Sequence, residues 1–130
     1  MARNFNGSSD NIQALSSPVT TYPMTLACWV KPTAVVSTRI YLSIGSSNGA
    51  DPSRVVLGQN NETVYGGTYN SVGNSRLYFG GPAFTAGSWT HIALVFTSSS
   101  NVILYAAGVS STTSTLTRGL TNIDLSLIHI

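Results

Sequence analysis

The sequence predicts an all-β fold, and three observations support this prediction. Short apolar runs alternate with clusters of Gly, Asn, Ser and Pro at spacings typical of β-sandwiches and β-barrels. No segment repeats apolar residues at i, i+3, i+4 and i+7 over the length of a helix. The chain is 42% hydrophobic and only 8% charged, which indicates a folded rather than a disordered protein. Its 130 residues suffice for one domain with a buried core.

The expected strands are the apolar or alternating runs, taken in chain order. They cover Arg3–Phe5, Asn11–Ala14, Met24–Lys31, Arg39–Gly45, Arg54–Gln59, Thr63–Tyr69, Arg76–Phe79, Trp89–Thr97, Val102–Ala107 and Ser114–Thr117. Turn-forming pairs and glycines separate them, among them Ser17-Pro18, Asn48-Gly49, Asp51-Pro52, Ala86-Gly87 and Gly108.

Two of these runs also predict which way their side chains point, because neighbouring side chains alternate between the faces of a strand. In Met24–Lys31 one face is uniformly apolar and is expected to point into the core, whereas Trp29 and Lys31 belong to the other face. In Trp89–Thr97 neither face is strongly polar. That pattern fits a central strand covered on both sides or a concave sheet that faces a ligand.

Charge and length exclude several classes of partner. The six cations are scattered without a basic run, so we expect no nucleic-acid binding. No apolar run is long enough to span a bilayer, and the N-terminus lacks the apolar segment of a secretory signal peptide. The single cysteine, Cys28, lies in an apolar run and is expected to be a buried thiol.

Four phrases occur in a fixed order along the chain. They are Phe5-Asn6-Gly7-Ser8-Ser9-Asp10-Asn11-Ile12, Trp29-Val30-Lys31-Pro32, Trp89-Thr90-His91-Ile92-Ala93 and Leu104-Tyr105-Ala106-Ala107-Gly108. This order resembles laminin-G-like, concanavalin A-like domains. The resemblance implies a two-sheet antiparallel jelly-roll β-sandwich in which Trp29, Trp89 and Tyr105 belong to the framework. One departure is Ala107, because such domains usually carry Asn or Asp before the glycine of this turn.

The resemblance also implies closing strands after the last phrase, which this chain does not contain. We therefore expect residues 1–124 to form a partial domain, incomplete at its C-terminus, with exposed strand edges. Residues 125–130 are what the codons CTG TCT CTT ATA CAC ATC would encode, a string that resembles a transposon-end adapter of sequencing libraries. We interpret them as adapter read-through. A short apolar terminal strand is the alternative, and resequencing across the codon for Asp124 distinguishes the two.

No catalytic residue is expected. Glycoside hydrolysis generally needs two carboxyl groups across the scissile bond, and Glu62 has no Asp or Glu two or four residues away. His91 lies in a framework phrase, and the chain has no Gly-x-Ser-x-Gly elbow. Calcium often occurs in the family, and Asp10 and Asp51 are the loop acids that could bind it. Both also fit as turn residues, so we expect no metal or other cofactor.

Candidate ligand-binding residues lie in the stretch from Asn60 to Tyr78. Sugar-binding surfaces combine an aromatic platform with side chains that hydrogen-bond, and tyrosine serves either as such a platform or at the edge of a core. The candidates are Tyr65, Tyr69, Asn70, Arg76 and Tyr78. Ordinary half-buried strand tyrosines are the alternative reading.

These observations predict a non-enzymatic binding or structural module. A beginning of the form Met-Ala-Arg-x-Phe-Asn-Gly, with no leader or disulfide, resembles domains of bacteriophage structural proteins. That resemblance implies a place on a virion, a phage tail or an extracellular surface, with glycans or other virion proteins as partners. A carbohydrate-binding appendage of a larger bacterial surface protein is the alternative, and a glucanase-type hydrolase is the third reading.

Overall fold

The computed structural model describes residues 4–6, 9–10, 12, 19, 21–45, 54–70, 73–78, 83–99, 101–111, 114–115 and 127–129. The strands within these ranges are β1 (Met24–Val30), β2 (Thr38–Gly45), β3 (Arg54–Asn60), β4 (Thr63–Asn70), β5 (Gly73–Tyr78), β6 (Thr90–Phe96), β7 (Asn101–Ala106), β8 (Val109–Ser110), β9 (Ser114–Thr115) and β10 (Leu127–His129). The described residues contain no helix, and thus none with the length and apolar character needed to cross a membrane.

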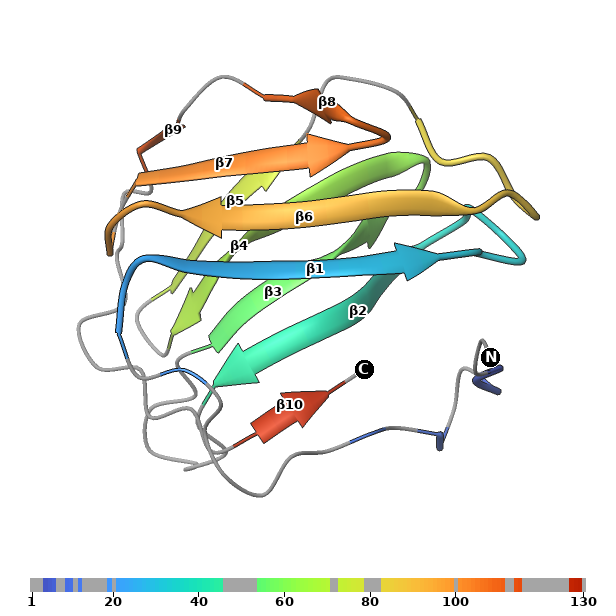
Figure 1. The fold of residues 1–130 in the computed structure, drawn as a ribbon. Helices are drawn as coiled ribbons and strands as arrows, with labels where there is room; N and C mark the ends of the chain where they lie inside the picture. The colour runs from blue at the N-terminus through green and yellow to red at the C-terminus, as the bar shows by residue number, and fades with distance from the viewer. Residues whose placement is uncertain are drawn as a thin grey trace.

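The strands form two antiparallel sheets that pack face to face as a jelly-roll sandwich (Figure 1). One sheet has the order β1-β6-β7-β8, with β9 also paired to β7, and the other has the order β10-β2-β3-β4-β5. Across the layers β1 lies over β2, β6 over β3, and β7 over β4. The predicted fold class is therefore confirmed.

The hydrophobic core lies between the two sheets and is built from their alternating inward side chains. Fully buried members are Val55, Leu57, Val64, Ile92, Leu94, Phe96, Val102 and Leu104. Gly66 makes room for one of them, because a Cβ on Gly66 would lie 2.8 Å from Cδ1 of Leu94. Each fully buried aliphatic or aromatic side chain of this size contributes roughly 1.5–3 kcal/mol to folding.

A second glycine shapes β2. The pairing of β2 with β3 shifts register between Ile40 and Leu42, which is the signature of a β-bulge. Gly58 on β3 pairs with Ile40 at this point, and a Cβ there would lie 2.1 Å from the carbonyl oxygen of Arg39. The close approach of the two backbones therefore requires glycine, and it fixes the position of Arg39 and Tyr41 beside the bulge.

The strands β1 to β7 and β9 confirm the corresponding predicted runs, although β5 begins at Gly73. β8 has no predicted counterpart and follows a turn in which Ala107 and Gly108 have φ angles of 50° and 81°. The predicted strands Arg3–Phe5 and Asn11–Ala14 are wrong at their described residues, which lie outside strands, and their remaining residues lie outside the described part. β10 falls in residues 125–130 and pairs with β2.

The inward face predicted for the first of the long strands is also confirmed. Met24, Leu26 and Val30 are buried and Cys28 is half-buried, whereas Trp29 and its neighbours on the opposite face are exposed.

Candidate functional site

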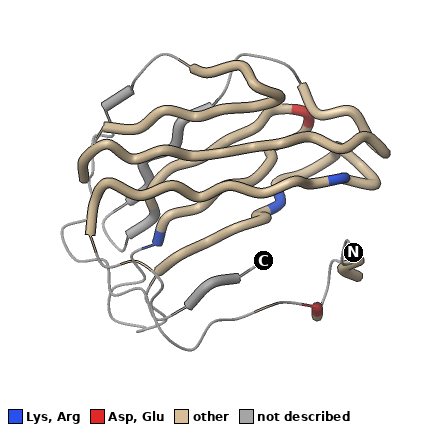
Figure 2. Tube along the Cα trace, viewed as in Figure 1, with Lys and Arg blue, Asp and Glu red and all other residues tan. Residues whose placement is uncertain are grey.

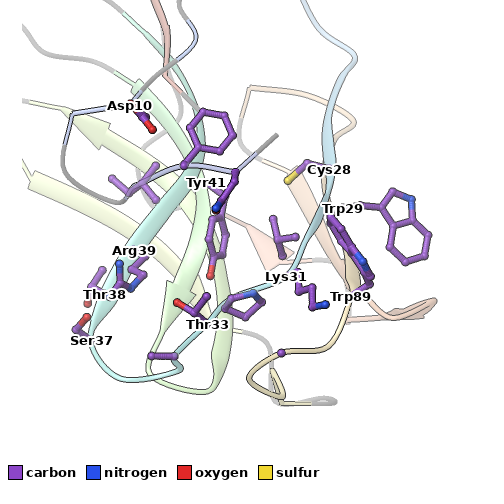
Figure 3. A pocket seen from close by; sticks show the side chains of 17 residues that line it. Asp10, Cys28, Trp29, Lys31, Thr33, Ser37, Thr38, Arg39, Tyr41 and Trp89 are labelled. Carbon is purple, nitrogen blue, oxygen red and sulfur yellow. The ribbon is translucent and has the colours of Figure 1, made fainter. Parts of the chain in front are cut away.

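A pocket of about 980 Å³ opens between β1 of one sheet and β2 of the other (Figure 3). We call it the inter-sheet pocket. Its size falls within the range of about 300–1,000 Å³ that is usual for sites of small ligands. It is lined by Asn4, Phe5, Asp10, Cys28, Trp29, Val30, Lys31, Pro32, Thr33, Ala34, Ser37, Thr38, Arg39, Ile40, Tyr41, Gly87 and Trp89.

Two exposed tryptophans lie at the rim of the pocket, and Figure 3 shows the ring of Trp29 on the side of β1 away from Cys28 and the pocket interior. Trp29 is 65% exposed and Trp89 is 51% exposed, although both are large apolar side chains. Trp29 pairs across the sheet with His91, and their ring centroids lie 5.3 Å apart at an interplanar angle of 53°. The imidazole therefore supports the indole of Trp29 from one side. This arrangement offers aromatic surface to a ligand at the rim of the pocket.

The loop from Lys31 to Ser37 joins the two sheets and is fastened to both. The N–H of Gly87 donates to the carbonyl of Pro32 at 2.7 Å, and Nε2 of Gln59 donates to the carbonyl of Ala34 at 3.2 Å. The N–H of Ser37 donates to Oδ1 of Asn61 at 3.0 Å. Since these bonds come from different strands and loops, the loop that lines the pocket is held in place before any ligand binds.

Tyr41 lines the pocket from β2. Its hydroxyl donates to Oε1 of the fully buried Gln59, and its ring packs edge-on against Phe84 with centroids 6.0 Å apart. Burial raises the pKa of Tyr41 to about 12, and the nearby charge of Arg39 acts in the opposite direction. The phenol therefore remains protonated and can serve as a fixed polar group.

Cys28 lines the pocket from β1 as a half-buried free thiol. Burial raises its pKa to about 11. A thiol with so high a pKa carries very little thiolate near neutral pH, so it acts as an apolar lining group rather than as a nucleophile.

The charged groups of the pocket come from three parts of the chain. Lys31 follows β1, Arg39 lies in β2, and Asp10 lies in the N-terminal segment. Oδ2 of Asp10 accepts a hydrogen bond from the N–H of Asn6 at 3.0 Å, and Oδ1 of Asn6 accepts the N–H groups of Ser9 and Asp10. The Asp10 carboxylate thus closes a local turn.

Among the predicted ligand-binding residues, Tyr65 has a described side chain, and it does not line this pocket. Tyr65 is only 2% exposed, so it is a buried strand residue and offers no platform to a ligand. The backbone pairs Tyr65 with Tyr78 and Gly67 with Arg76, and Tyr69 and Asn70 belong to the same pair of strands. The side chains of Tyr69, Asn70, Arg76 and Tyr78 lie outside the described part of the structure.

Of the two predicted calcium ligands, the structure describes Asp10 but not Asp51. Asp10 takes the turn-closing role that the sequence also suggested, and Asp51 lies outside the described residues. Among the residues that the structure describes, no three His, Cys, Asp or Glu side chains gather in one place.

Sequence reasoning did not anticipate the exposed tryptophans, because the phrases that contain them were expected to supply framework. One signal was available in the alternation of Met24–Lys31, which places Trp29 beside Lys31 on the face opposite the core. Exposed apolar side chains that lie together in one patch mark contact surfaces, whereas single ones do not.

Comparison with known proteins agrees with this architecture. The laminin G-like family model described as "Concanavalin A-like lectin/glucanases superfamily" matches residues 6–128. No curated protein matches the chain. Domains LG4-5 of the mouse laminin alpha1 chain have a similar fold, with a TM-score of 0.69 at 12% sequence identity.

That similarity covers 97% of this chain but only 33% of the laminin structure, so the chain spans about a third of its length. At this level of identity the laminin structure supports the fold alone. The family match, in contrast, extends over nearly the whole chain. The chain belongs to the concanavalin A-like lectin/glucanases superfamily, as a laminin G-like domain.

Proposed function

We propose that this domain is a non-enzymatic module that binds glycans in the inter-sheet pocket. The exposure of Trp29 and Trp89 together at its rim is the observation that carries this proposal. Sugars present an apolar C–H face and a ring of hydroxyls, so their binding sites need aromatic surface and hydrogen-bonding groups at once. The pocket offers both, since Tyr41, Thr38 and Ser37 line it on the side opposite Trp89.

The charged groups of the pocket favour binding over hydrolysis. Asp10 is the only described carboxylate that lines it, and this side chain accepts a hydrogen bond from the backbone of its own turn. Glu62 is exposed in the connection between β3 and β4 and does not line the pocket. Because glycoside hydrolysis generally requires two opposed carboxyl groups, this arrangement supports a module without catalytic activity.

We infer a place on a virion or phage tail for this module, on the strength of the N-terminal phrase that resembles bacteriophage structural proteins. Display on such a particle would bring the pocket to the glycans of a host surface. An appendage of a larger bacterial surface protein is the alternative. Capsid and tail genes beside the complete gene support the first setting, and a polysaccharide-utilisation cluster there overturns it.

Glycan binding is tested by titrating the protein with a panel of neutral and acidic oligosaccharides. Trp29 and Trp89 are the only tryptophans in the chain, so intrinsic fluorescence reports on this pocket alone. Binding heats give the affinities of the variants. Trp29→Ala and Trp89→Ala are each expected to weaken binding about 10-fold, because an aromatic contact is worth roughly 1 kcal/mol beyond its buried area.

The matched controls either keep an aromatic ring at the same position or place a substitution far from the pocket. Trp29→Phe and Trp89→Phe keep an aromatic face and should retain most of the affinity. Val109→Ala removes an exposed apolar side chain from β8, at the opposite edge of the sheet from β1, and should leave binding unchanged. If a folded Trp29→Ala, Trp89→Ala double variant binds glycans as well as the parent protein, the pocket is not the site.

A further inference from the structure

We propose that β1 accepts an extended peptide segment of a partner protein as an additional strand, and that alternate apolar side chains of this segment enter the inter-sheet pocket. This inference goes beyond glycan binding and does not depend on it. A segment seated in this way would compete with a glycan for the pocket.

The first support is that β1 has a neighbour on one side only. All of its residues, Met24–Val30, pair with β6, and no other strand in the described part of the chain pairs with β1. Figure 1 shows β1 at the border of its sheet. The backbone N–H and C=O groups that point away from β6 therefore form a template on which another strand can be added.

The second support is that β1 lacks the features that protect the edges of natural sheets, which are charged side chains, prolines and bulges. Met24–Val30 contains no charged residue and no proline, and Figure 2 shows no charged segment along this strand. Its register with β6 is unbroken. On the opposite side of the pocket, β2 carries Arg39 and the bulge between Ile40 and Leu42. We therefore expect a strand to be added to β1 rather than to this part of β2.

The third support is that the core is incompletely covered on this side of the sandwich. The apolar side chains that pack against the core but are only partly buried belong to β1, to β2, or to the segments before and between these strands. Within the described residues they are Val19, Tyr22, Cys28, Val35, Tyr41 and Leu42. Two of them, Cys28 and Tyr41, also line the inter-sheet pocket. A strand added beside β1 would place its inward side chains against this partly exposed apolar surface.

These features favour a separate extended segment over a second copy of β1. The inward side chains Met24, Leu26 and Val30 are buried in the core of their own domain, so β1 of another copy would bring its backbone but no side chain for the pocket. A separate segment supplies both main-chain bonds, which give affinity, and alternate side chains, which give specificity. The chain itself contains one example of such addition, since β10 pairs with the edge of β2 along Ser43–Gly45.

The test uses an acetylated and amidated peptide, Thr-Val-Thr-Val-Thr-Val-Thr, in which every second side chain is apolar. Calorimetric titration measures its affinity for the 130-residue chain. The control peptide Thr-Thr-Val-Val-Val-Thr-Thr has the same composition but cannot turn all its valines to one face, so we expect it to bind at least about 10-fold more weakly. Hydrogen exchange should show new protection at alternate amides of β1 and no change in the central strand β3.

Methylation of the peptide backbone distinguishes strand pairing from simple apolar contact. Successive N–H groups of a strand point to opposite edges, so the valines and the threonines of the peptide donate in opposite directions. One peptide is N-methylated on its valines and another on its threonines. We expect one of the two to lose affinity at least about 10-fold, because it cannot donate to β1, and the other to bind like the parent peptide.

A variant of the chain locates the site. Cys28→Lys places a charge on the inward side of β1, which is one of the ways in which natural edges are protected, and should weaken peptide binding at least about 10-fold. Val109→Lys adds the same charge to the exposed strand β8, at the opposite edge of the sheet, and should leave the affinity unchanged. Circular dichroism checks that both variants fold, and the methylated peptides decide the question if Cys28→Lys does not.

Preference for the alternating peptide, loss of affinity with one pattern of methylation only, and new protection of β1 together support the inference. Equal binding of the two unmethylated peptides, or no binding of either, overturns it. Amides of β1 that are all protected before peptide is added would show that the chain covers this edge itself. Protection that rises with protein concentration alone would assign the edge to a second copy. Both results also overturn the inference, and none of these outcomes depends on whether the domain binds glycans.

Discussion

Cys28 shows how the pocket changes the chemistry of a single residue. Burial raises its pKa to about 11, from 9.0 for a free thiol. At pH 8 the thiolate fraction is then roughly 100-fold lower than that of an exposed cysteine, and alkylation proceeds through the thiolate. We predict that iodoacetamide labels Cys28 in the native protein roughly 100-fold more slowly than in urea. Mass spectrometry of timed samples measures both rates, and equal rates would show an exposed thiol.

Tyr41 and Cys28 together predict how stability depends on alkaline pH. Both pKa values are raised by burial, so the folded protein holds these protons more tightly than the unfolded chain. The stabilisation is fully present below the unfolded values of 9.0 and 10.0, and it is lost as the pH rises through about 11 and 12. Burial also raises the pKa of Tyr22, which acts in the same direction.

The measurement is the urea midpoint from pH 8 to pH 12. We expect a constant value up to about pH 9 and a fall above it. Cys28→Ser should flatten the early part of the fall and Tyr41→Phe the late part. A profile that both variants leave unchanged would place the alkaline transition at other groups.

The turn between β7 and β8 contains one residue, Ala107, that is unfavourable for the conformation it adopts. Ala107 has a φ of 50° and precedes Gly108 at 81°, as in a two-residue hairpin turn that favours Asn followed by Gly. We predict that Ala107→Asn raises the free energy of unfolding by about 0.5–1 kcal/mol. Ala107→Val is the opposite control, since a β-branched residue tolerates positive φ poorly. Chemical denaturation should place the parent protein between the two variants.

Two glycines are closely packed in different ways. Gly58 lies against the backbone of β2, and Gly66 lies against the side chain of Leu94. A Cβ on Gly58 would meet the carbonyl oxygen of Arg39 at 2.1 Å, whereas one on Gly66 would meet Cδ1 of Leu94 at 2.8 Å. A backbone moves less readily than the end of a side chain. We therefore predict that Gly58→Ala destabilises the fold more than Gly66→Ala, by about 3 kcal/mol against about 1 kcal/mol.

Gly58→Ala should also weaken ligand binding, because it displaces the bulge that positions Arg39 and Tyr41. Gly66→Ala lies away from the pocket and should leave the affinity unchanged, so the pair separates loss of stability from loss of the site. If Gly66→Ala destabilised the fold more than Gly58→Ala, the backbone of β2 would move more easily than the side chain of Leu94.

The two sheets share one core, and this predicts the behaviour of the whole molecule. Leu94 is fully buried in β6 and lies over Gly66 of the other sheet. We predict that Leu94→Ala lowers the free energy of unfolding by about 2–5 kcal/mol and that both sheets still melt in a single transition. Val109→Ala, on the exposed strand β8, should change it by less than about 0.5 kcal/mol. Separate transitions in circular dichroism and tryptophan fluorescence would contradict a shared core.

The fold could be predicted well from the sequence, but the site only in part, for a physical reason. Alternation along Met24–Lys31 encodes its buried face within one strand, so it can be read locally and is confirmed. The inter-sheet pocket, in contrast, is lined by residues of both sheets, and no local pattern encodes which of them the fold brings to one pocket. Tyr65 was predicted to bind a ligand because polar residues and glycines surround it in the sequence. Its burial depends on packing between the sheets, which that local composition does not show.

The loop from Lys31 to Ser37 leads from one sheet to the other, and the pocket beside it has a wall on each. A ligand that contacts both walls would link the two sheets to one another. Any pull that tends to splay β1 from β2 must then break the ligand contacts as well as the core at that edge. Ligand binding would therefore also raise the resistance of the two sheets to separation.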